Sequence, residues 1–327
     1  LDNPSRVLLL PWCAWLVWAT GVRMSGLWYG AIAGLVIAFS VSLGQASLGV
    51  ERVGSDANPI VFANAVLALL VVAVFCRPAA RNASTCLMLV AVIVLANVAV
   101  ILSGSRGVLP GLGLVVLVLL LGTAPRHRWW RLAGAVGVLA VLFAALWMVP
   151  WLSAQFRLHE LHADVSGLAS GHVDKPVSAR IALLSVAWDA FRESPLMGVG
   201  IDAFASQVDA SRYCQGAERH FCGLAHAHND VAQWGATMGI AGLAALAALY
   251  LAPLSIVARR IRQSRLDLPV GPAWTAGMLV ATYMVSGLTQ SMFAHALSTS
   301  AFVIFVGLLT GSALLPDPHP SRADSHS

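Results

Sequence analysis

The sequence predicts an all-α membrane protein that crosses the bilayer many times. Of its residues, 58% are hydrophobic and only 11% are charged, whereas about a quarter of the residues in a soluble domain are charged. The mean hydropathy is +0.77, and long apolar runs alternate with arginine-bearing connections. In a soluble protein the net charge of +5 would suggest a nucleic-acid partner. Because the arginines here lie between apolar runs, they indicate membrane orientation and no nucleic acid.

Nine apolar runs are candidates for transmembrane helices. A helix needs roughly 20 mostly apolar residues to cross the hydrocarbon core. The candidate runs are 7–22, 26–44, 59–76, 84–103, 107–123, 132–151, 234–257, 270–289 and 295–315. We therefore predict six helices in residues 1–151, a long loop at 152–233, three helices in 234–315 and a tail at 316–327.

Arginines in the connections predict the orientation of these helices. They occur in alternate loops: Arg23; Arg77 and Arg81; Arg126, Arg128 and Arg131; Arg259, Arg260, Arg262 and Arg265. The positive-inside rule places these loops in the cytoplasm, so the connections 45–58, 103–107, 152–233 and 290–294 face outward. This arrangement puts Leu1 outside and the tail inside. The chain starts with leucine and shows no signal peptide, so we expect missing N-terminal spans; three of them would make twelve in total.

The loop at 152–233 is far longer than the other connections. Within it, "SARIALLSVAWDAFRESPLMGVG" (178–200) has apolar residues at the spacing of one helical face: Ile181, Leu184, Trp188 and Phe191. We expect a helix lying at the outer membrane–water boundary, ended by Pro195 and the glycines Gly198 and Gly200.

The cysteines divide by compartment. Cys214 and Cys222 lie in the long outer loop, which is an oxidising setting if this is a bacterial envelope protein. We predict a disulfide between them, with two free thiols as the alternative. Cys13, Cys76 and Cys86 lie in or beside apolar runs and are most simply small hydrophobic residues.

The charged residues that stand out lie at the outer ends of the spans, and the span centres lack the ionisable groups of a coupled transporter. Arg106, in "SGSRGVLPG", could extend to the lipid headgroups or bind a phosphate through its two-pronged guanidinium. Arg180 lies at the start of the predicted boundary helix. Taken alone, it is most simply interpreted as a charged side chain of that helix facing water.

The stretch "GLAHAHNDVAQWGATMGIAGL" (223–243) holds alternating His226, His228 and Asp230, as metallo-hydrolase motifs of the form H-x-H-x-D-H do. The sixth position of that motif is Val231 here. On a helix, positions 226 and 228 would point about 200° apart. An extended segment would leave a metal open, but we predict none.

A second interpretation of this stretch is a helix start. Asp230 and Gln233 have the spacing of a capping box, so a helix would begin here, capped by Asn229 or Asp230, with its positive end outward. His228 would precede that end, where a neutral imidazole is favoured and can act as a general base. The three glycines Gly235, Gly239 and Gly242 would thin one side of the helix for close packing.

Four motifs occur in order along the chain: "NPIVFANAVLALL" (58–70), "SGSRG" (103–107), "RIALLSVAWDAFRESPLMGVG" (180–200) and "HNDVAQWGATMGIAG" (228–242). The last is His-Asn, nine residues, then G-x-x-G. The ordered set, over roughly residues 50–310, resembles the O-antigen ligase family. Its superfamily also includes O-antigen polymerases and protein O-oligosaccharyltransferases.

The resemblance implies a GT-C-like glycosyltransferase of the bacterial inner membrane, with twelve spans and one large periplasmic loop. It implies transfer of polysaccharide from an undecaprenyl-pyrophosphate-linked O-antigen donor to a lipid A–core acceptor on the periplasmic face. The reaction inverts the anomeric centre and needs neither a cofactor nor a metal. At the matched positions, Arg106 and Arg180 would bind the pyrophosphate, and His228 would take the proton from the acceptor hydroxyl.

Four further residues are candidates for binding the acceptor or supporting His228, with an ordinary surface position as the alternative: His226, Asn229, Tyr213 and His295. His220, Glu51, Arg52 and Asp56 are weaker candidates. The competing functions are a polymerase or a protein oligosaccharyltransferase of the same superfamily. From a different class, a lipid-linked sugar flippase would need polar groups along a membrane path, which the spans lack.

Overall fold

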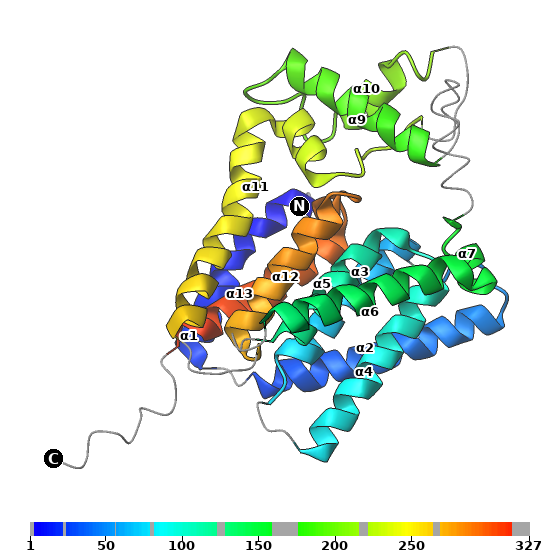
Figure 1. Cartoon of the computed structure of the whole chain (residues 1–327). Coiled ribbons are helices and arrows are strands. Elements are labelled where there is room, and N and C mark those ends of the chain that lie inside the picture. The colour runs from blue at the N-terminus through cyan, green and yellow to red at the C-terminus, as the bar shows by residue number, and fades with distance from the viewer. Residues whose placement is uncertain are drawn as a thin grey trace.

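The computed structural model describes residues 3–21, 24–55, 57–78, 82–122, 128–158, 176–215, 222–263 and 269–315. Within these ranges the chain is helical and contains no strand (Figure 1), which confirms the all-α class. Several residues named above lie outside the described ranges: Arg23, Asp56, Arg81, Arg126, His220, Arg265 and the tail 316–327.

Each of the nine predicted spans coincides with a helix. These helices are α1 (Leu10–Thr20), α2 (Ser25–Ser47), α3 (Pro59–Phe75), α4 (Ala83–Ser103), α5 (Leu109–Leu121), α6 (Arg128–Met148), α11 (Asp230–Gln263), α12 (Pro272–Gly287) and α13 (Ala296–Leu314). Three short 3₁₀ turns accompany them, η1 (Asn3–Leu9), η2 (Arg106–Val108) and η3 (Met292–Ala294). The long loop contributes α7 (Pro150–Gln155), α9 (Pro176–Glu193) and α10 (Phe204–Ala210).

Four of the described helices are long and apolar enough to cross a membrane, namely α2, α4, α11 and α13. Shorter apolar helices cover Ser5–Thr20, Pro59–Phe75, Arg106–Leu121 and Val136–Met148. The chain is therefore a multi-pass membrane protein by its helices, and the full set of nine spans stays a prediction.

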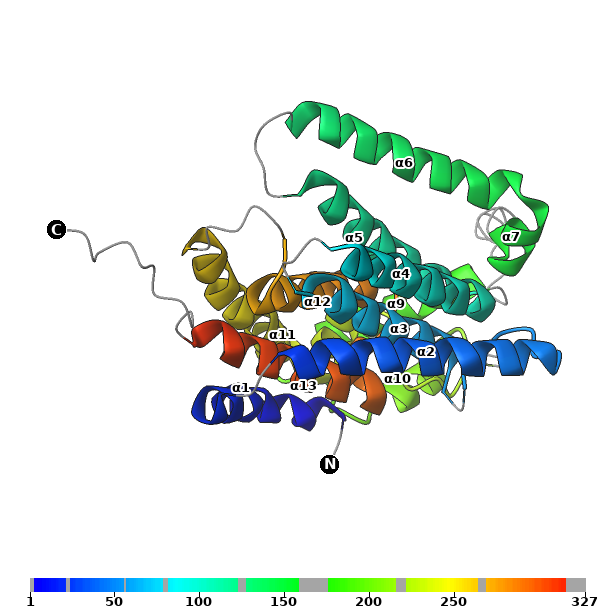
Figure 2. The ribbon, with the colours of Figure 1, turned by 90° about the horizontal axis from the view of Figure 1, so that it is seen from below.

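The core of the bundle is built around α3. Asn58 begins this helix by accepting a hydrogen bond from the Ile60 N–H (2.9 Å), and nearly every residue from Val61 to Phe75 is buried. It is apolar on all sides, as expected of a helix enclosed by others, and it contacts α2, α4, α12 and α13. In contrast, α6 lies at one margin of the bundle, where it contacts α5 and α7 (Figure 2).

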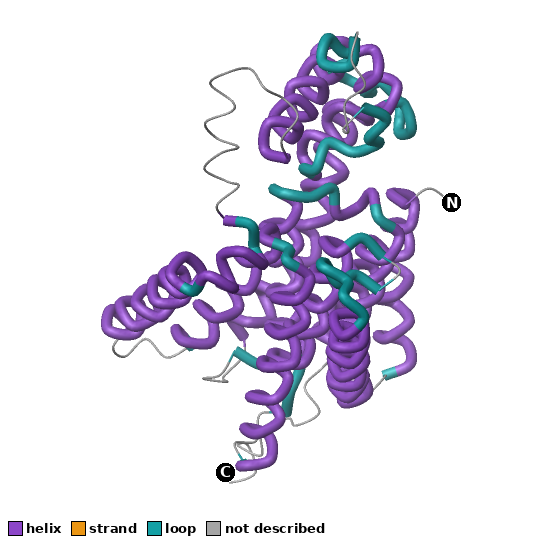
Figure 3. The backbone as a smooth tube through the Cα atoms, turned by 90° about the vertical axis from the view of Figure 1, so that its right-hand side faces the viewer, coloured by secondary structure: helices purple, strands orange, loops and turns teal. Residues whose placement is uncertain are grey.

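Loops that were predicted to share one side do meet at one end of the bundle. The Val53 N–H donates to Leu102 O (3.2 Å), and the Gln155 amide donates to the same carbonyl (3.1 Å). The arginine-bearing connections approach one another at the opposite end, where the Gly271 N–H donates to Phe75 O (2.7 Å). We call the end where Val53, Leu102 and Gln155 meet the loop end. Helices α9 and α10 lie over this end (Figures 1 and 3).

Helix α9 has two apolar sides. Its small residues, with Leu183 and Val186, are buried in a cluster with Phe204 and Val208 of α10. The larger residues predicted to face the membrane boundary, Ile181, Leu184 and Trp188, are exposed, Trp188 by 59%. An apolar exposed side is what a boundary helix requires, and the boundary position itself stays a prediction.

Candidate active site

The helix that carries the glycine motif is interrupted. Within α11, Gly239 adopts φ 63° and ψ −151°, which is not helical. The segment 195–200 hydrogen-bonds to backbone groups on both sides of this break: Val199 N–H to Ala236 O (2.9 Å), Gly200 N–H to Thr237 O (3.0 Å) and Ile240 N–H to Pro195 O (2.8 Å). Two family-like motifs, "PLMGVG" and G-x-x-G, are therefore parts of one joint.

Glycine is required at this joint for steric reasons. A Cβ on Gly239 would lie 2.5 Å from the carbonyl carbon of Leu196, and a Cβ on Gly198 would overlap the backbone of Met238. Both glycines also have positive φ, which other residues rarely adopt. The predicted end of α9 is confirmed, since the helix stops at Glu193, just before Pro195. The prediction that Gly239 thins one side of a helix is wrong, because α11 is not helical at that residue; Gly198 and Gly239 let two backbones meet at the break.

The first turn of α11 is capped by Asn229. Its side-chain oxygen accepts the Ala232 N–H (2.9 Å), and its amide donates to Leu288 O (3.0 Å). Of the two residues predicted for the cap, Asn229 is therefore confirmed, and the capping-box role of Asp230 is wrong. Asp230 is only 2% exposed and faces inward, where it accepts hydrogen bonds from the Phe293 N–H (3.3 Å) and the Tyr250 hydroxyl (3.5 Å). Asn229 takes the cap because the helix starts one residue after it.

His228 precedes this cap in a left-handed backbone conformation, with φ 51°. Such a conformation costs a non-glycine residue about 1–3 kcal/mol and occurs often at functional sites. Two hydrogen bonds hold the segment in place: His228 Nδ1 to Gln290 Oε1 (2.7 Å) and the Asn229 N–H to Ser291 Oγ (3.2 Å). The loop between α12 and η3 thus orients the imidazole.

Gln290 also contacts a second histidine. Its Nε2 lies 2.7 Å from Nε2 of His295, and the His295 ring meets the ring of His226 edge-on, with centroids 5.2 Å apart. We call His226, His228, Gln290 and His295 the histidine group. Burial lowers the pKa of His228, the Gln290 bond partly opposes this, and the charges of Arg180 and His226 lower the pKa further. The imidazole is therefore neutral at ordinary pH, as a general base requires.

Four arginines from different elements lie within electrostatic range of one another, and one of them, Arg180, also acts on His228. We call Arg52, Arg106, Arg157 and Arg180 the arginine group. Burial lowers the pKa of Arg180, and the nearby charge of Arg106 lowers it further. Burial also lowers the pKa of Arg52, as do the charges of the other three. Like charges held together in partial burial favour binding of an anion.

Backbone carbonyls hold two of these arginines. The Arg106 Nη1 donates to Arg157 O (2.9 Å), and the Arg52 Nε donates to Ser103 O (3.3 Å). Arg157 itself adopts a left-handed conformation, with φ 52°, which directs its carbonyl to Arg106. These arginines come from the loop before α3, the turn η2, the second residue after α7, and α9.

Among the described residues, no group of three or more histidine, cysteine or acidic side chains could hold a metal ion. His226 and His228 are engaged with His295 and Gln290 instead. Asp230, the third member of the alternating motif, is turned into the core.

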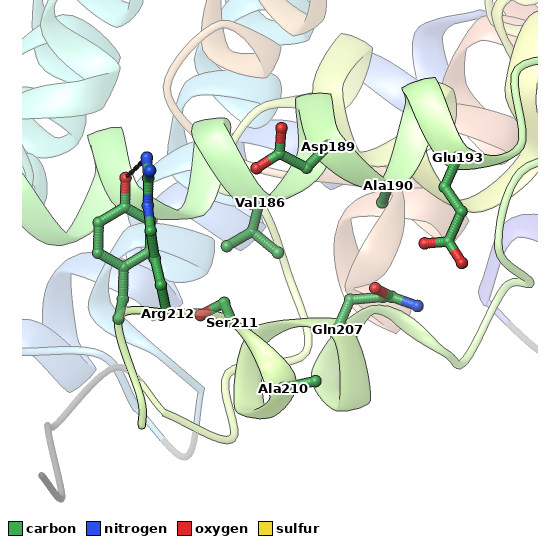
Figure 4. Close-up of a pocket in the computed structure, with 9 residues that line it drawn as sticks. Val186, Asp189, Ala190, Glu193, Gln207, Ala210, Ser211 and Arg212 are labelled. Atoms are coloured by element: carbon green, nitrogen blue, oxygen red, sulfur yellow. Dashed lines mark hydrogen bonds between the residues drawn. The ribbon is translucent and has the colours of Figure 1, made fainter. Parts of the chain in front are cut away.

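Tyr213 lies in a different place from the histidine group. It lines a hollow of about 280 Å³ between α9 and the end of α10, together with Asp189, Glu193 and Gln207 (Figure 4). Its hydroxyl accepts a hydrogen bond from Arg212 (2.9 Å). The adjacent Cys214 and Cys222 are joined by a disulfide, with Cα atoms 6.0 Å apart, which ties the chain after α10 to the segment leading to His228.

The structure thus brings together most of the predicted site residues. His226, Asn229 and His295 surround His228, and the pKa effects link Arg106 to Arg180 and Arg180 to His228. Sequence reasoning missed Gln290, Ser291 and Arg157. The polar pair Gln290–Ser291 directly follows an apolar run at a predicted outward loop, and this was the available signal; nothing in the local pattern marks Arg157.

Comparison with protein-family models gives a match over the middle of the chain. A model described as O-antigen ligase matches residues 89–247, which include Arg106, Arg157, Arg180 and His228. This range is narrower than the 50–310 of the motif resemblance, and Arg52, Gln290 and His295 lie outside it. No curated protein matches the chain.

Proposed function

We propose that the protein transfers a finished polysaccharide from undecaprenyl pyrophosphate to lipid A–core, on the basis of the O-antigen ligase family model that matches residues 89–247. The active site would lie at the loop end, facing the periplasm from the bacterial inner membrane. All nine described apolar helices would span the membrane, and with three more the fold would have the twelve spans of the family. The long loop would lie on the periplasmic face over a GT-C-like bundle.

One observation carries this proposal. Arg180, from α9, lies close enough to His228 for its charge to lower the histidine's pKa, and Arg106 acts on Arg180 in the same way. Two arginines that would bind an anion therefore lie within electrostatic range of a neutral imidazole. This combination suits a reaction in which a pyrophosphate leaves while a hydroxyl loses its proton.

The proposed step is a single displacement. The acceptor oxygen bonds to the anomeric carbon of the donor, and its proton passes to Nε2 of His228. The bond from that carbon to the pyrophosphate oxygen breaks, and the bonding electron pair leaves with undecaprenyl pyrophosphate. Because attack comes from the face opposite the leaving group, the anomeric centre inverts. Arg106 and Arg180 stabilise the charge that grows on the pyrophosphate.

The pyrophosphate ester already supplies the driving force, so we expect the reaction to need neither a nucleotide nor a metal. The acceptor candidates from the sequence divide between two places. His226, Asn229 and His295 lie with His228, whereas Tyr213 lines the hollow beside α9. A sugar of the glycan could occupy that hollow, since carboxylate, amide and hydroxyl groups line it.

The lipopolysaccharide ladder of a strain lacking this protein tests the proposal. A ligase predicts loss of every O-antigen band, accumulation of the lipid-linked polymer, and rescue by the wild-type chain. A single added repeat unit would indicate a polymerase instead. Loss of glycan from envelope proteins alone would indicate a protein oligosaccharyltransferase. Lipid-linked units retained on the cytoplasmic face would indicate a flippase. A normal ladder rejects both the ligase and the polymerase.

A further inference from the structure

Gln290 is a buried amide placed between two histidines. It is only 2% exposed and lies in the loop between α12 and η3, where its own N–H donates to Ser286 O (3.0 Å). Its side chain spans from His228 to His295, with both contacts at 2.7 Å. The hydroxyl of the next residue, Ser291, accepts a hydrogen bond from the Asn229 N–H. The loop therefore holds both the imidazole of His228 and the backbone that follows it.

The chemistry of an amide determines the direction of both hydrogen bonds. An amide oxygen can only accept, so Nδ1 of His228 must carry a proton. An amide nitrogen can only donate, so Nε2 of His295 must present its lone pair. A neutral imidazole has one protonated nitrogen, and the proton on Nδ1 therefore leaves the lone pair of His228 on Nε2.

We propose that Gln290 is a positioning residue, which holds His228 in the tautomer whose free lone pair is at Nε2 while His295 holds the amide in the required orientation. This inference rests on the proposed function, because only a base needs that lone pair. With the amide reversed, Gln290 would donate to Nδ1 of His228, and the proton would then sit on Nε2, where the base could accept none.

The same bond serves the charged form of the base. After His228 takes the acceptor proton on Nε2, Nδ1–H still donates to the amide oxygen, so the ring does not need to move. A neutral amide also adds no negative charge that would raise the basicity of the imidazole. The other groups around His228 are Arg180 from α9, His226 before it and His295; Asp230 is engaged with Phe293 and Tyr250.

The experiment compares Gln290→Leu and Gln290→Glu in the full chain, in membranes supplied with lipid-linked polysaccharide and lipid A–core. Gln290→Leu removes both bonds. We expect kcat to fall roughly 10- to 100-fold, the loss seen when a partner that orients a metal-binding histidine is removed, with KM for the acceptor unchanged. Gln290→Glu can still accept from Nδ1–H. It should keep more activity than Gln290→Leu, and the acid limb of its pH profile should move to higher pH because a carboxylate stabilises the imidazolium.

A matched control uses Gln263, an exposed glutamine at the other end of α11. Gln263→Leu and Gln263→Glu should leave the rate and the pH profile unchanged. A merely structural Gln290 would lower the amount of folded protein in both of its variants without moving the pH midpoint. That result, or wild-type rates in both variants, would overturn the proposal.

Two further measurements separate this inference from the proposed function. His228→Ala in the same assay reports on the function: full activity there removes the base itself. If His228→Ala is inactive while the Gln290 variants behave as wild type, the function stands and the positioning role is wrong. Nitrogen NMR of isotope-labelled histidine gives the tautomer without activity. We expect the Nε2 signal lost in His228→Ala to be that of an unprotonated ring nitrogen, and a protonated signal would contradict the proposal.

Discussion

The histidine group and the arginine group lie at the same end of the bundle, yet they are held in different ways. Short hydrogen bonds join His228, Gln290 and His295: the amide oxygen of Gln290 contacts His228, and its amide nitrogen contacts His295. The arginine group consists of like charges, which lower the pKa of Arg52 and of Arg180, held in part by backbone carbonyls. The first group is arranged before any substrate arrives, whereas the second is stabilised when an anion binds. Under the proposed function, the histidine group would orient the base and the arginine group would bind the donor, so that the two tasks fall to separate parts of the structure.

Removal of the base should have the largest effect. His228→Ala is expected to lower ligation by roughly 10²- to 10⁴-fold, the usual contribution of a general base, while the protein still inserts in the membrane. The measurement is the rate of transfer from lipid-linked polysaccharide to lipid A–core. His226→Ala, a histidine two residues away, is the control and should lose much less. Full activity in His228→Ala would end the base assignment.

Removal of a pyrophosphate ligand should come next. Arg180→Ala is expected to lower kcat/KM by roughly 10²- to 10³-fold, as loss of a donor to developing charge does. Arg180→Lys should not restore activity, because an ammonium cannot replace two-pronged binding. Arg192→Ala changes an exposed arginine on the same helix and should be neutral. Wild-type activity in Arg180→Lys would show that charge alone suffices.

The joint at Gly239 connects the segment after α9, the helix that carries Arg180, to α11, which follows His228. Disrupting the joint should therefore destabilise the elements that carry both groups. Gly239→Ala is expected to destabilise the fold by about 1–3 kcal/mol from the backbone conformation alone, with more from the contact to Leu196. Thermal unfolding of the solubilised protein measures this loss. In Gly235→Ala the added Cβ would meet its nearest neighbour at 3.6 Å, an ordinary contact, so that variant should be tolerated. Equal stability of the two variants would be inconsistent with the joint.

Loss of the cap should be a smaller effect with a specific signature. Asn229→Ala is expected to cost about 0.5–2 kcal/mol of stability and also to lower ligation, because the cap follows His228 directly. Asn82→Ala removes the comparable cap of α4, where the side chain accepts the Thr85 N–H (2.8 Å). Both variants should lose similar stability, but only Asn229→Ala should lose ligation beyond its loss of folded protein.

The smallest effect should be a shift in pH dependence that couples the two groups. The acid limb of ligation is expected below pH 6.5, the ordinary pKa of histidine, because burial lowers the pKa of His228. Arg180 lowers that pKa as well. Removing its charge in Arg180→Gln should raise the pKa of His228, so the acid limb of the residual activity should lie at a higher pH than in the wild type. A limb that stays in place would mean that the arginine acts on the donor alone.

Much of this arrangement could be predicted because it depends on local composition. Helix-forming apolar runs and alternate arginines marked the helices and the loops that meet. The motifs pointed to Arg106, Arg180 and His228. Two details were wrong because they depend on a single residue's backbone. Asp230 and Asn229 are equally good caps by type, and only the register of the first turn assigns the cap to Asn229. From the sequence alone, the glycines of α11 fit a continuous helix as well as a broken one. Only the contact with "PLMGVG" shows that the helix is broken at Gly239.

The sequence by itself determined the all-α membrane class, the nine helical segments and the residues with suitable chemistry, since these follow from hydrophobic runs and side-chain type. Only the tertiary structure decided which of those residues meet. Gln290 lies 62 positions from His228, and Arg157 lies 51 from Arg106, distances over which no periodicity carries information. The break at Gly239 was likewise decided there, because its lost helical hydrogen bonds are replaced by a segment that is remote in sequence.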